Sequence, residues 1–340
     1  MRPTTKDLAK AAGVSLATVD RVLNERPGVR QKTVETVNHA IKEIGFERNQ
    51  LAATLARKRG YRFGFVLPKE GDEFLREILL RVREANVTGR AEMIEVKAIR
   101  IDEHDPHKAA RALARVSAED FDGVAVMAPE TPQIRDAIKR MRERGIMTIP
   151  FIANQQDIVR DSFVGINNCA AGATAGRLMG RFTCGKMGSV AVVNETMQSR
   201  DTLERRLGFD GISNEFFPNL TVLPSLETFG DPERAHRIIE TTLNANADLL
   251  GVYIIGSEAR VPLEAMERLG HGKDLIVLAH ERTPTTTNAL KEGKLAAVIT
   301  QDTGHLVRSA VRILRAKCEN RSAVSSQERI RIEILIAENL

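Results

Sequence analysis

The stretch Thr4–Asn24 has the sequence TTKDLAKAAGVSLATVDRVLN, in which two short helical patterns flank Gly13. Thr4 and Asp7 are spaced as a capping box that begins the first helix. Gly13 can adopt the left-handed conformation that ends a helix and turns the chain. Ser15 is a favourable N-cap for the second helix. This layout predicts a helix-turn-helix, whose second helix presents its early residues to the DNA major groove.

Both predicted helices are amphipathic. Their inward positions, at helical spacing, are Leu8, Ala9, Ala12, Val19, Val22 and Leu23. The opposite side of the second helix carries Leu16, Ala17, Asp20 and Arg21. An ordinary helical hairpin has the same spacing, so the pattern alone leaves both interpretations open.

The segment Ala12–Asn24 resembles the LacI (lactose repressor) family of bacterial transcription regulators, which open with a helix and then A-G-V-S-x-x-T-V-S-R-V-L-N. This chain has AGVSLATVDRVLN and departs at Asp20, where the family has a serine near a DNA phosphate. A carboxylate at that position would repel the phosphate. The resemblance implies DNA contacts from this segment and its neighbours, namely Thr5, Ser15, Leu16, Ala17, Thr18, Arg21 and Asn24.

The distribution of charge supports this interpretation. The chain of 340 residues carries a net charge of +5. Residues 1–60 contain twelve Lys or Arg and six Asp or Glu, a net charge of +6, so the remainder carries −1. All the excess positive charge therefore lies on the segment predicted to bind DNA phosphates.

A third helical pattern ends at Gly45, and a basic segment follows. Its apolar positions are Val34, Val37, Ile41 and Ile44. The next residues resemble the family's hinge, G-[YF]-x-x-N-x-x-A-x-x-L, and match it at Gly45, Phe46, Asn49, Ala52 and Leu55. The resemblance implies DNA contacts by Asn49 and Leu55, in a hinge helix of about residues 49–58 that forms on DNA and inserts Leu55 into the minor groove. An ordinary basic linker is the alternative.

From Tyr61 onward, short apolar runs alternate with amphipathic helical stretches, which predicts an α/β fold with parallel sheets covered by helices on both faces. The run Arg329–Ile336 is predicted to be an edge or half-buried strand. The resemblance covers nearly the whole chain. It implies an all-α helix-turn-helix headpiece (1–60) and a two-lobed body (61–340) like the type I periplasmic-binding proteins. We expect one lobe at about 61–165 and 295–322, and the other at about 166–294 and 323–340.

In that fold a ligand binds between the lobes, at the carboxyl ends of the strands. Polar residues follow several predicted strands, and Arg205 lies in RRLGF, which resembles the family's R-x-x-G-[FW], where the arginine contacts the effector. The predicted effector-binding residues are Phe74, Asn154, Asn167, Arg205, Ser257, His280, Glu281 and Gln301. Their chemistry suits a small polar effector, a sugar-like molecule or a small polar acid. Helix caps and turn residues are the alternative for each of them.

Signatures of other protein classes are weak. Gly185–Ser189 lacks P-loop spacing, Gly256–Glu258 lacks the second glycine of a nucleophile elbow, and His280-Glu281 lacks the second histidine of a metalloprotease helix. We therefore expect no catalytic residues, no metal and no cofactor. The three cysteines lack metal spacing and are expected to be reduced, buried thiols. No signal peptide or membrane span is evident, which favours the cytoplasm.

The sequence thus predicts a transcription regulator, expected to be a repressor, that binds a near-palindromic operator as a homodimer under control of a small effector. A regulator without an effector stays open. A solute-binding protein or an enzyme body carrying a DNA-binding domain is less favoured, because residues 1–60 are basic and no catalytic constellation is present.

Overall fold

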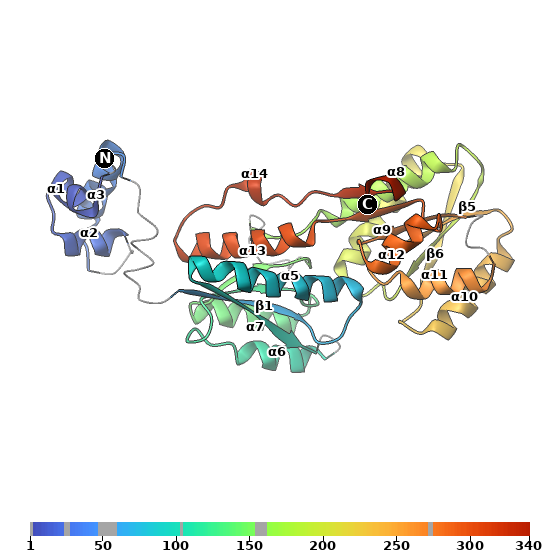
Figure 1. The fold of residues 1–340 in the computed structure, drawn as a ribbon, viewed down its shortest axis with the longest axis horizontal. Helices are drawn as coiled ribbons and strands as arrows, with labels where there is room; N and C mark the ends of the chain where they lie inside the picture. Colours follow the sequence, from blue (N-terminus) through green and yellow to red (C-terminus); the bar gives the residue numbers. More distant parts are fainter. Residues whose placement is uncertain (1–2, 24–27, 47–59, 103–104, 154–161, 271–274) are drawn as a thin grey trace. The chain divides into compact units, whose positions relative to one another are not determined.

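The computed structural model describes residues 3–23, 28–46, 60–102, 105–153, 162–270 and 275–340. The chain divides into two compact units, Met1–Gly60 and Tyr61–Leu340 (Figure 1). Each unit is described by itself. Among the described residues, no helix has both the length and the apolar character needed to cross a membrane.

The first unit contains the helices α1 (Thr5–Ala12), α2 (Leu16–Leu23) and α3 (Gln31–Glu43). The predicted capping box is confirmed, because the amide of Asp7 donates to Oγ1 of Thr4 and the amide of Thr4 donates to the Asp7 carboxylate. Gly13 ends α1 in the left-handed region at φ 64°, as the turn requires. The amide of Thr18 donates to Oγ of Ser15 at 3.1 Å, so Ser15 caps α2.

These three helices enclose a small core. Its buried side chains are Leu8, Ala9, Ala12, Val19, Val22, Val37, Ala40 and Phe46. The inward faces predicted for α1 and α2 are therefore confirmed. A core of this size gives only marginal stability on its own.

The second unit begins with a four-stranded parallel sheet. Its order is β2 (Ile94–Ile101), β1 (Tyr61–Pro68), β3 (Gly123–Val126) and β4 (Met147–Pro150). One face packs against α5 (Glu73–Gly89) and α13 (Thr303–Cys318). The other packs against α6 (Pro106–Ala114) and α7 (Pro132–Glu143). A short 3-10 helix, η1 (Arg90–Glu92), follows α5.

A six-stranded sheet forms the other lobe. Its order is β10 (Glu333–Leu335), β9 (Ala297–Thr300), β8 (Ile276–His280), β7 (Leu249–Ile254), β5 (Gly188–Asn194) and β6 (Leu220–Glu227). One face packs against α8 (Asn168–Phe182) and α9 (Arg200–Phe216). The other carries α10 (Pro232–Ala245), α11 (Arg260–Arg268) and α12 (Pro284–Lys291). The short elements α14 (Ser325–Glu328) and η3 (Ala337–Asn339) lie near the C-terminus.

Four sequence expectations differ from the structure. The strand β9 pairs with β8 and with β10, so it belongs to the second lobe. The helix α13, which follows β9, packs on the sheet of the first lobe. The chain therefore returns to the first lobe after Thr300 and not at the expected residue 295. The strand β6 was not predicted, because its sequence LTVLPSLE contains a proline and mixes polar and apolar residues. The predicted final strand shortens to β10, which pairs antiparallel at the sheet edge. Cys169 and Cys184 are exposed rather than buried; Cys169 lies in the first turn of α8, and Cys184 follows the C-cap Thr183 of that helix.

Candidate functional site

In the first unit, the outward side of α2 carries the residues predicted to contact DNA. Leu16 is 47% exposed, and Ala17 and Arg21 are exposed, whereas Val19 and Val22 on the opposite side are buried. An exposed arginine on such a helix can donate to a guanine edge, and small apolar side chains can contact a thymine methyl.

Hydroxyl groups surround the start of the same helix. Oγ of Ser15 lies 2.9 Å from Oγ1 of Thr18, and Thr5 is exposed at the start of α1. Hydroxyls and helix starts of this kind contact DNA phosphates in many complexes. The predicted DNA contacts Asn24, Asn49 and Leu55 lie outside the described residues.

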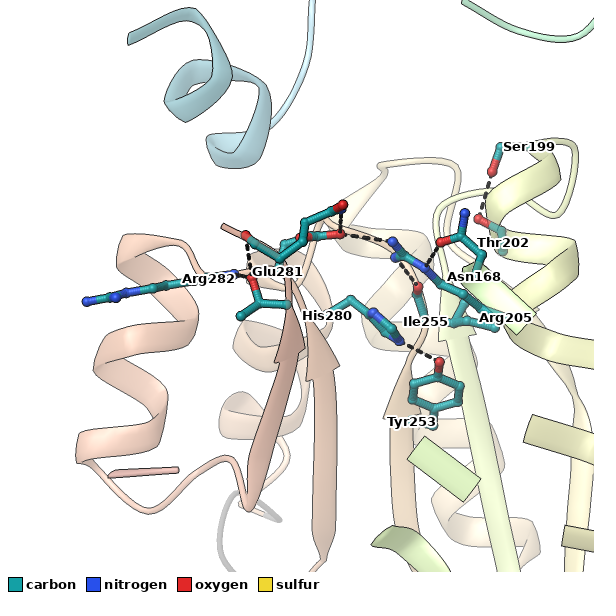
Figure 2. A network of polar contacts seen from close by, with 11 residues as sticks. Asn168, Ser199, Thr202, Arg205, Tyr253, Ile255, His280, Glu281 and Arg282 are labelled. Carbon is teal, nitrogen blue, oxygen red and sulfur yellow. Dashed lines mark hydrogen bonds and ion pairs between the residues drawn. The ribbon is translucent and has the colours of Figure 1, made fainter. Parts of the chain in front are cut away.

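In the second unit, Arg205 of α9 is the centre of a buried polar cluster (Figure 2). Its Nη2 donates to Oε1 of Glu281 at 2.9 Å, and its Nε donates to Oδ1 of Asn168 at 2.9 Å. Its Nη1 donates to the carbonyl oxygen of Ile255 at 3.1 Å. Nε2 of Gln301 donates to the same Glu281 oxygen at 3.1 Å. The cluster therefore joins the carboxyl ends of β7, β8 and β9.

Two close helix contacts bring Arg205 and Asn168 together. A Cβ atom built on Gly172 would collide with the backbone of Arg205, and one built on Gly208 would collide with the backbone of Cys169. The backbones of α8 and α9 therefore touch at these two glycines. Glycine is required there, because any side chain would push the helices apart.

The backbone holds Glu281 in an uncommon conformation. Its φ is 63°, in the left-handed region that favours glycine. Its amide donates to the carbonyl of Ile299 at 2.9 Å, and its own carbonyl accepts from Oγ1 of Thr286 at 2.8 Å. Such strained backbone persists when the surroundings fix it, and it is frequent at functional sites. Here it directs the Glu281 carboxyl toward Arg205.

Burial and the charge of the partner have opposite effects on the pKa values of Arg205 and Glu281. Burial raises the pKa of the Glu281 carboxyl, and the Arg205 guanidinium offsets part of that rise. Burial alone would lower the pKa of Arg205, but the carboxylates of Glu281 and Asp201 more than compensate, so its pKa is raised. Arg205 therefore stays charged at every physiological pH.

His280, the last residue of β8, lies beneath this pair and points toward Tyr253 (Figure 2). Its Nε2 lies 2.6 Å from the Tyr253 hydroxyl, and its Nδ1 has no partner among the described residues. Burial, with the nearby charge of Arg205, lowers the pKa of His280 well below its usual value. The ring is therefore neutral near pH 7.

Polar contacts join the two lobes close to this cluster. Oε2 of Glu73, at the start of α5, accepts from the amide of Thr285 in the first turn of α12 at 3.0 Å. Nη1 of Arg200 in α9 lies 2.7 Å from Oε2 of Glu130 in the first lobe. The lobes therefore meet around the strand ends that carry Glu281.

Comparison with known proteins places both units in families. Residues 4–49 match the model described as bacterial regulatory proteins, lacI family, and residues 63–322 match the periplasmic binding protein domain. The chain belongs to the lacI family of bacterial regulatory proteins. The predicted headpiece and α/β body are confirmed by these matches and by the structure.

Similar lacI-family proteins cover this chain in part. It is 42% identical over 79 residues to the HTH-type transcriptional regulator RegA of Clostridium saccharobutylicum, covering 23% of this chain and 24% of RegA. It is 28% identical over 158 residues to DegA of Bacillus subtilis, covering 46% and 45%. It is 26% identical over 215 residues to the sucrose operon repressor of Streptococcus mutans, covering 61% and 60%. The chain thus spans less than two thirds of each relative.

Solved structures share the fold of the lacI-family body. A putative LacI transcriptional regulator from Bacteroides fragilis has a TM-score of 0.72 at 19% identity, covering 83% of this chain and 98% of that one. A solute-binding protein of Burkholderia graminis, solved with D-arabinose, has a TM-score of 0.71 at 19% identity, covering 83% and 96%. At these identities the likeness establishes the fold alone.

Of the residues predicted to bind an effector in this lacI-family body, the structure brings Arg205, Glu281 and Gln301 into one cluster. Asn167 is exposed and caps α8 by accepting from the amide of Ala170. Ser257 is partly buried after β7.

Two further predicted residues pack inside the protein. Phe74 is 3% exposed and belongs to the hydrophobic core, and His280 hydrogen-bonds Tyr253. Asn154 lies outside the described residues. Effector contact by each of the eight residues stays a prediction. No group of three or more His, Cys, Asp or Glu within the described ranges could hold a metal ion.

Three residues of this region were absent from the predicted set. Asn168 rather than Asn167 contacts Arg205, because neighbouring residues at a helix start point in different directions. Asn194 ends β5 with its side chain buried and without a partner among the described residues. The signal in the sequence for Asn194 was its position as a polar residue directly after the apolar run of β5. Asp72 lies near enough to raise the pKa of Glu281.

Proposed function

We propose that this lacI-family chain is a cytoplasmic, sequence-specific DNA-binding repressor that binds a near-palindromic operator as a homodimer. The exposed side of α2 supports the proposal most directly. Leu16, Ala17 and Arg21 lie there together, backed by a packed helical core, in the segment that holds all the excess positive charge. A helix with these exposed residues suits the major groove, and the surrounding basic residues suit phosphates.

We further propose that residues 61–340 bind a small polar effector between the two lobes, through the cluster centred on Arg205. Relatives include repressors named for sucrose and ribose operons, and a structural neighbour was solved with D-arabinose, which supports a sugar-like effector. Glu73 and Glu130 of the first lobe already contact the second, so a ligand that prefers one arrangement of the lobes can shift the equilibrium between arrangements.

The body carries exposed apolar side chains that suit a dimer interface. On α9, Leu203 and Leu207 are 49% and 68% exposed and one helical turn apart, and on α5 Leu80 and Val87 are 44% and 65% exposed. Exposed apolar side chains that lie side by side on one helix, as Leu203 and Leu207 do, are typical of sites where proteins associate.

The test is a selection of genomic DNA fragments by the full chain, followed by affinity measurements on the selected operator. We expect affinity to fall by about a thousandfold across a fourfold rise in salt, because several phosphate contacts release counterions. A variant lacking residues 1–60 should lose DNA binding and stay dimeric by analytical ultracentrifugation. A flat salt response, or equal binding by the shortened variant, would refute the proposal.

A further inference from the structure

The exposed side of α2 carries an acidic residue among those predicted to contact DNA. Asp20 lies three residues after Ala17 and four after Leu16, so the three side chains are neighbours on one face of the helix. All three are exposed, as is Arg21, whereas the opposite side of α2 is buried in the helical core. Asp20 therefore belongs to the surface that is proposed to enter the major groove.

Two common roles of a carboxylate within a helix do not explain Asp20. A helical ion pair needs a cation three or four residues away, but positions 16, 17, 23 and 24 hold leucine, alanine, leucine and asparagine. A carboxylate is also stabilising at a helix start, but Ser15 caps the start of α2 and Asp20 lies in the second half of this eight-residue helix. The surface that Asp20 shares with Leu16 and Ala17 is therefore the feature to consider.

The chemistry of a carboxylate limits what it can contact on DNA. Its oxygens only accept hydrogen bonds, and they are repelled by the phosphate that the family's serine at this position approaches. In the major groove cytosine offers the N4 amino group as a donor and no acceptor of its own, whereas guanine and thymine offer acceptors. Adenine has its N6 donor beside the N7 acceptor. A carboxylate at Asp20 therefore suits cytosine best.

The apolar neighbours of Asp20 strengthen this preference. Leu16 is 47% exposed and Ala17 is exposed, and neither side chain can hydrogen-bond a base. When they pack against base edges they exclude water, so the carboxylate loses its solvent. A base pair without a donor for Asp20 would leave a desolvated charge without compensation, and rejection of such base pairs adds to specificity.

We propose that Asp20 is a specificity-determining residue of this headpiece, which accepts a hydrogen bond from the N4 amino group of a cytosine in each half-site and rejects the other bases there. Arg21 reads a different position, because adjacent residues on a helix point about 100° apart. The carboxylate thus lowers general affinity for phosphates and raises preference at one base pair. This inference rests on the proposed DNA-binding function and adds a residue to its reading surface.

The experiment selects binding sites from random double-stranded DNA with the full chain, for the wild type, Asp20→Asn and Asp20→Ser. Asparagine keeps the shape of the side chain, and serine is the residue that the family has here. We expect the wild type to select cytosine at one position of each half-site, distinct from the position relaxed in Arg21→Ala. In both Asp20 variants this preference should fall by about tenfold, while affinity for random DNA rises because the phosphate repulsion is removed.

A base analogue tests the same contact from the DNA side. Replacing the selected cytosine by 2-pyrimidinone removes only the 4-amino group, so it should weaken binding by the wild type about tenfold and by Asp20→Ser less than about twofold. Glu43→Gln is the matched control, because Glu43 is an exposed carboxylate of the same unit, on α3. Its base preferences should equal those of the wild type.

The outcomes separate this inference from the proposed function. A selected operator without a cytosine preference, or one whose base preferences are the same in both Asp20 variants, overturns the inference and leaves the repressor function standing. Equal losses on the analogue for the wild type and Asp20→Ser overturn it as well. A wild-type protein that selects no operator refutes the proposed function, and the inference with it.

Discussion

Replacing Arg205 by methionine should destabilise the body strongly. The Arg205 side chain is 3% exposed and donates to Glu281, Asn168 and the carbonyl of Ile255. Its removal leaves the Glu281 carboxyl, 1% exposed, with Gln301 as its donor. Removing one partner of a buried ion pair costs roughly 3–5 kcal/mol, because the remaining charge stays buried without compensation.

The companion change Glu281→Gln should be about as costly. Glutamine keeps an acceptor for Arg205, but the guanidinium stays charged and loses its buried carboxylate partner. We therefore expect a cost of roughly 3–5 kcal/mol for this variant as well. In the double variant neither charge of the pair is stranded, so its cost should fall short of the sum of the two single costs by about 1–3 kcal/mol.

The measurement is urea unfolding of the full chain, followed by circular dichroism, for the wild type, both single variants and the double variant. Arg200→Met is the matched control on the same helix. Arg200 also pairs with carboxylates, Glu130 and Glu204, but its side chain is 32% exposed, and we expect a cost below about 1 kcal/mol. Additivity within about 0.5 kcal/mol, or an Arg205→Met cost as small as that of Arg200→Met, would refute the argument.

Three further predictions concern the headpiece and the body. Arg21→Ala should cost roughly 1–3 kcal/mol of operator binding per half-site and relax base preference at one position, measured on a library of operator variants; equal weakening on every sequence would make Arg21 a phosphate contact. Leu55→Ala should lower operator affinity more than affinity for random DNA, measured by competition, because an inserted side chain matters only where the DNA is kinked; equal losses would contradict this. His280 has a folded pKa well below its unfolded value near 6.5, so the body should lose up to about 1.4 kcal/mol of stability per pH unit as the pH falls below 6.5. His280→Gln should reduce that slope in thermal unfolding between pH 7.5 and 5.5, and an unchanged slope would assign the acid sensitivity to other groups.

The sequence predicts the headpiece well because its signals are local. The capping box of Thr4 and Asp7, the turn at Gly13 and the cap at Ser15 each depend on residues within four positions of one another. The parallel α/β character of the body follows from alternating patterns of the same short range. Local signals do not predict which strands pair, because the sequence of β9 alone is compatible with either sheet. Its pairing with β8 depends on contacts made across the fold.

The candidate site shows the same limit at the level of single residues. The motif around Arg205 identifies the residue, but its partner Glu281 lies 76 positions away and meets it because α9 packs on the sheet whose strand β8 ends just before Glu281. The side chains of two adjacent residues can also point in different directions. His280 points toward Tyr253 while Glu281 points toward Arg205, and a one-residue error in the position of the strand end would exchange the two roles.

The contacts that Arg205 makes in the structure change the role that we expect of it in ligand binding. From the sequence, an arginine in a ligand-binding motif is a donor for a hydroxyl, a carboxylate or a phosphate. In the structure each of its nitrogens donates to the protein, and its charge is matched by Glu281. Nη1 and Nη2 each carry a second N–H besides the one that bonds the protein, so a ligand acceptor can bind the guanidinium while the ion pair stays intact. A ligand that donates to the open oxygens of Glu281 and Gln301 would likewise add bonds and break none. The chemistry of the ligand is therefore better inferred from all the donors and acceptors that the cluster leaves unpaired than from the presence of the arginine alone.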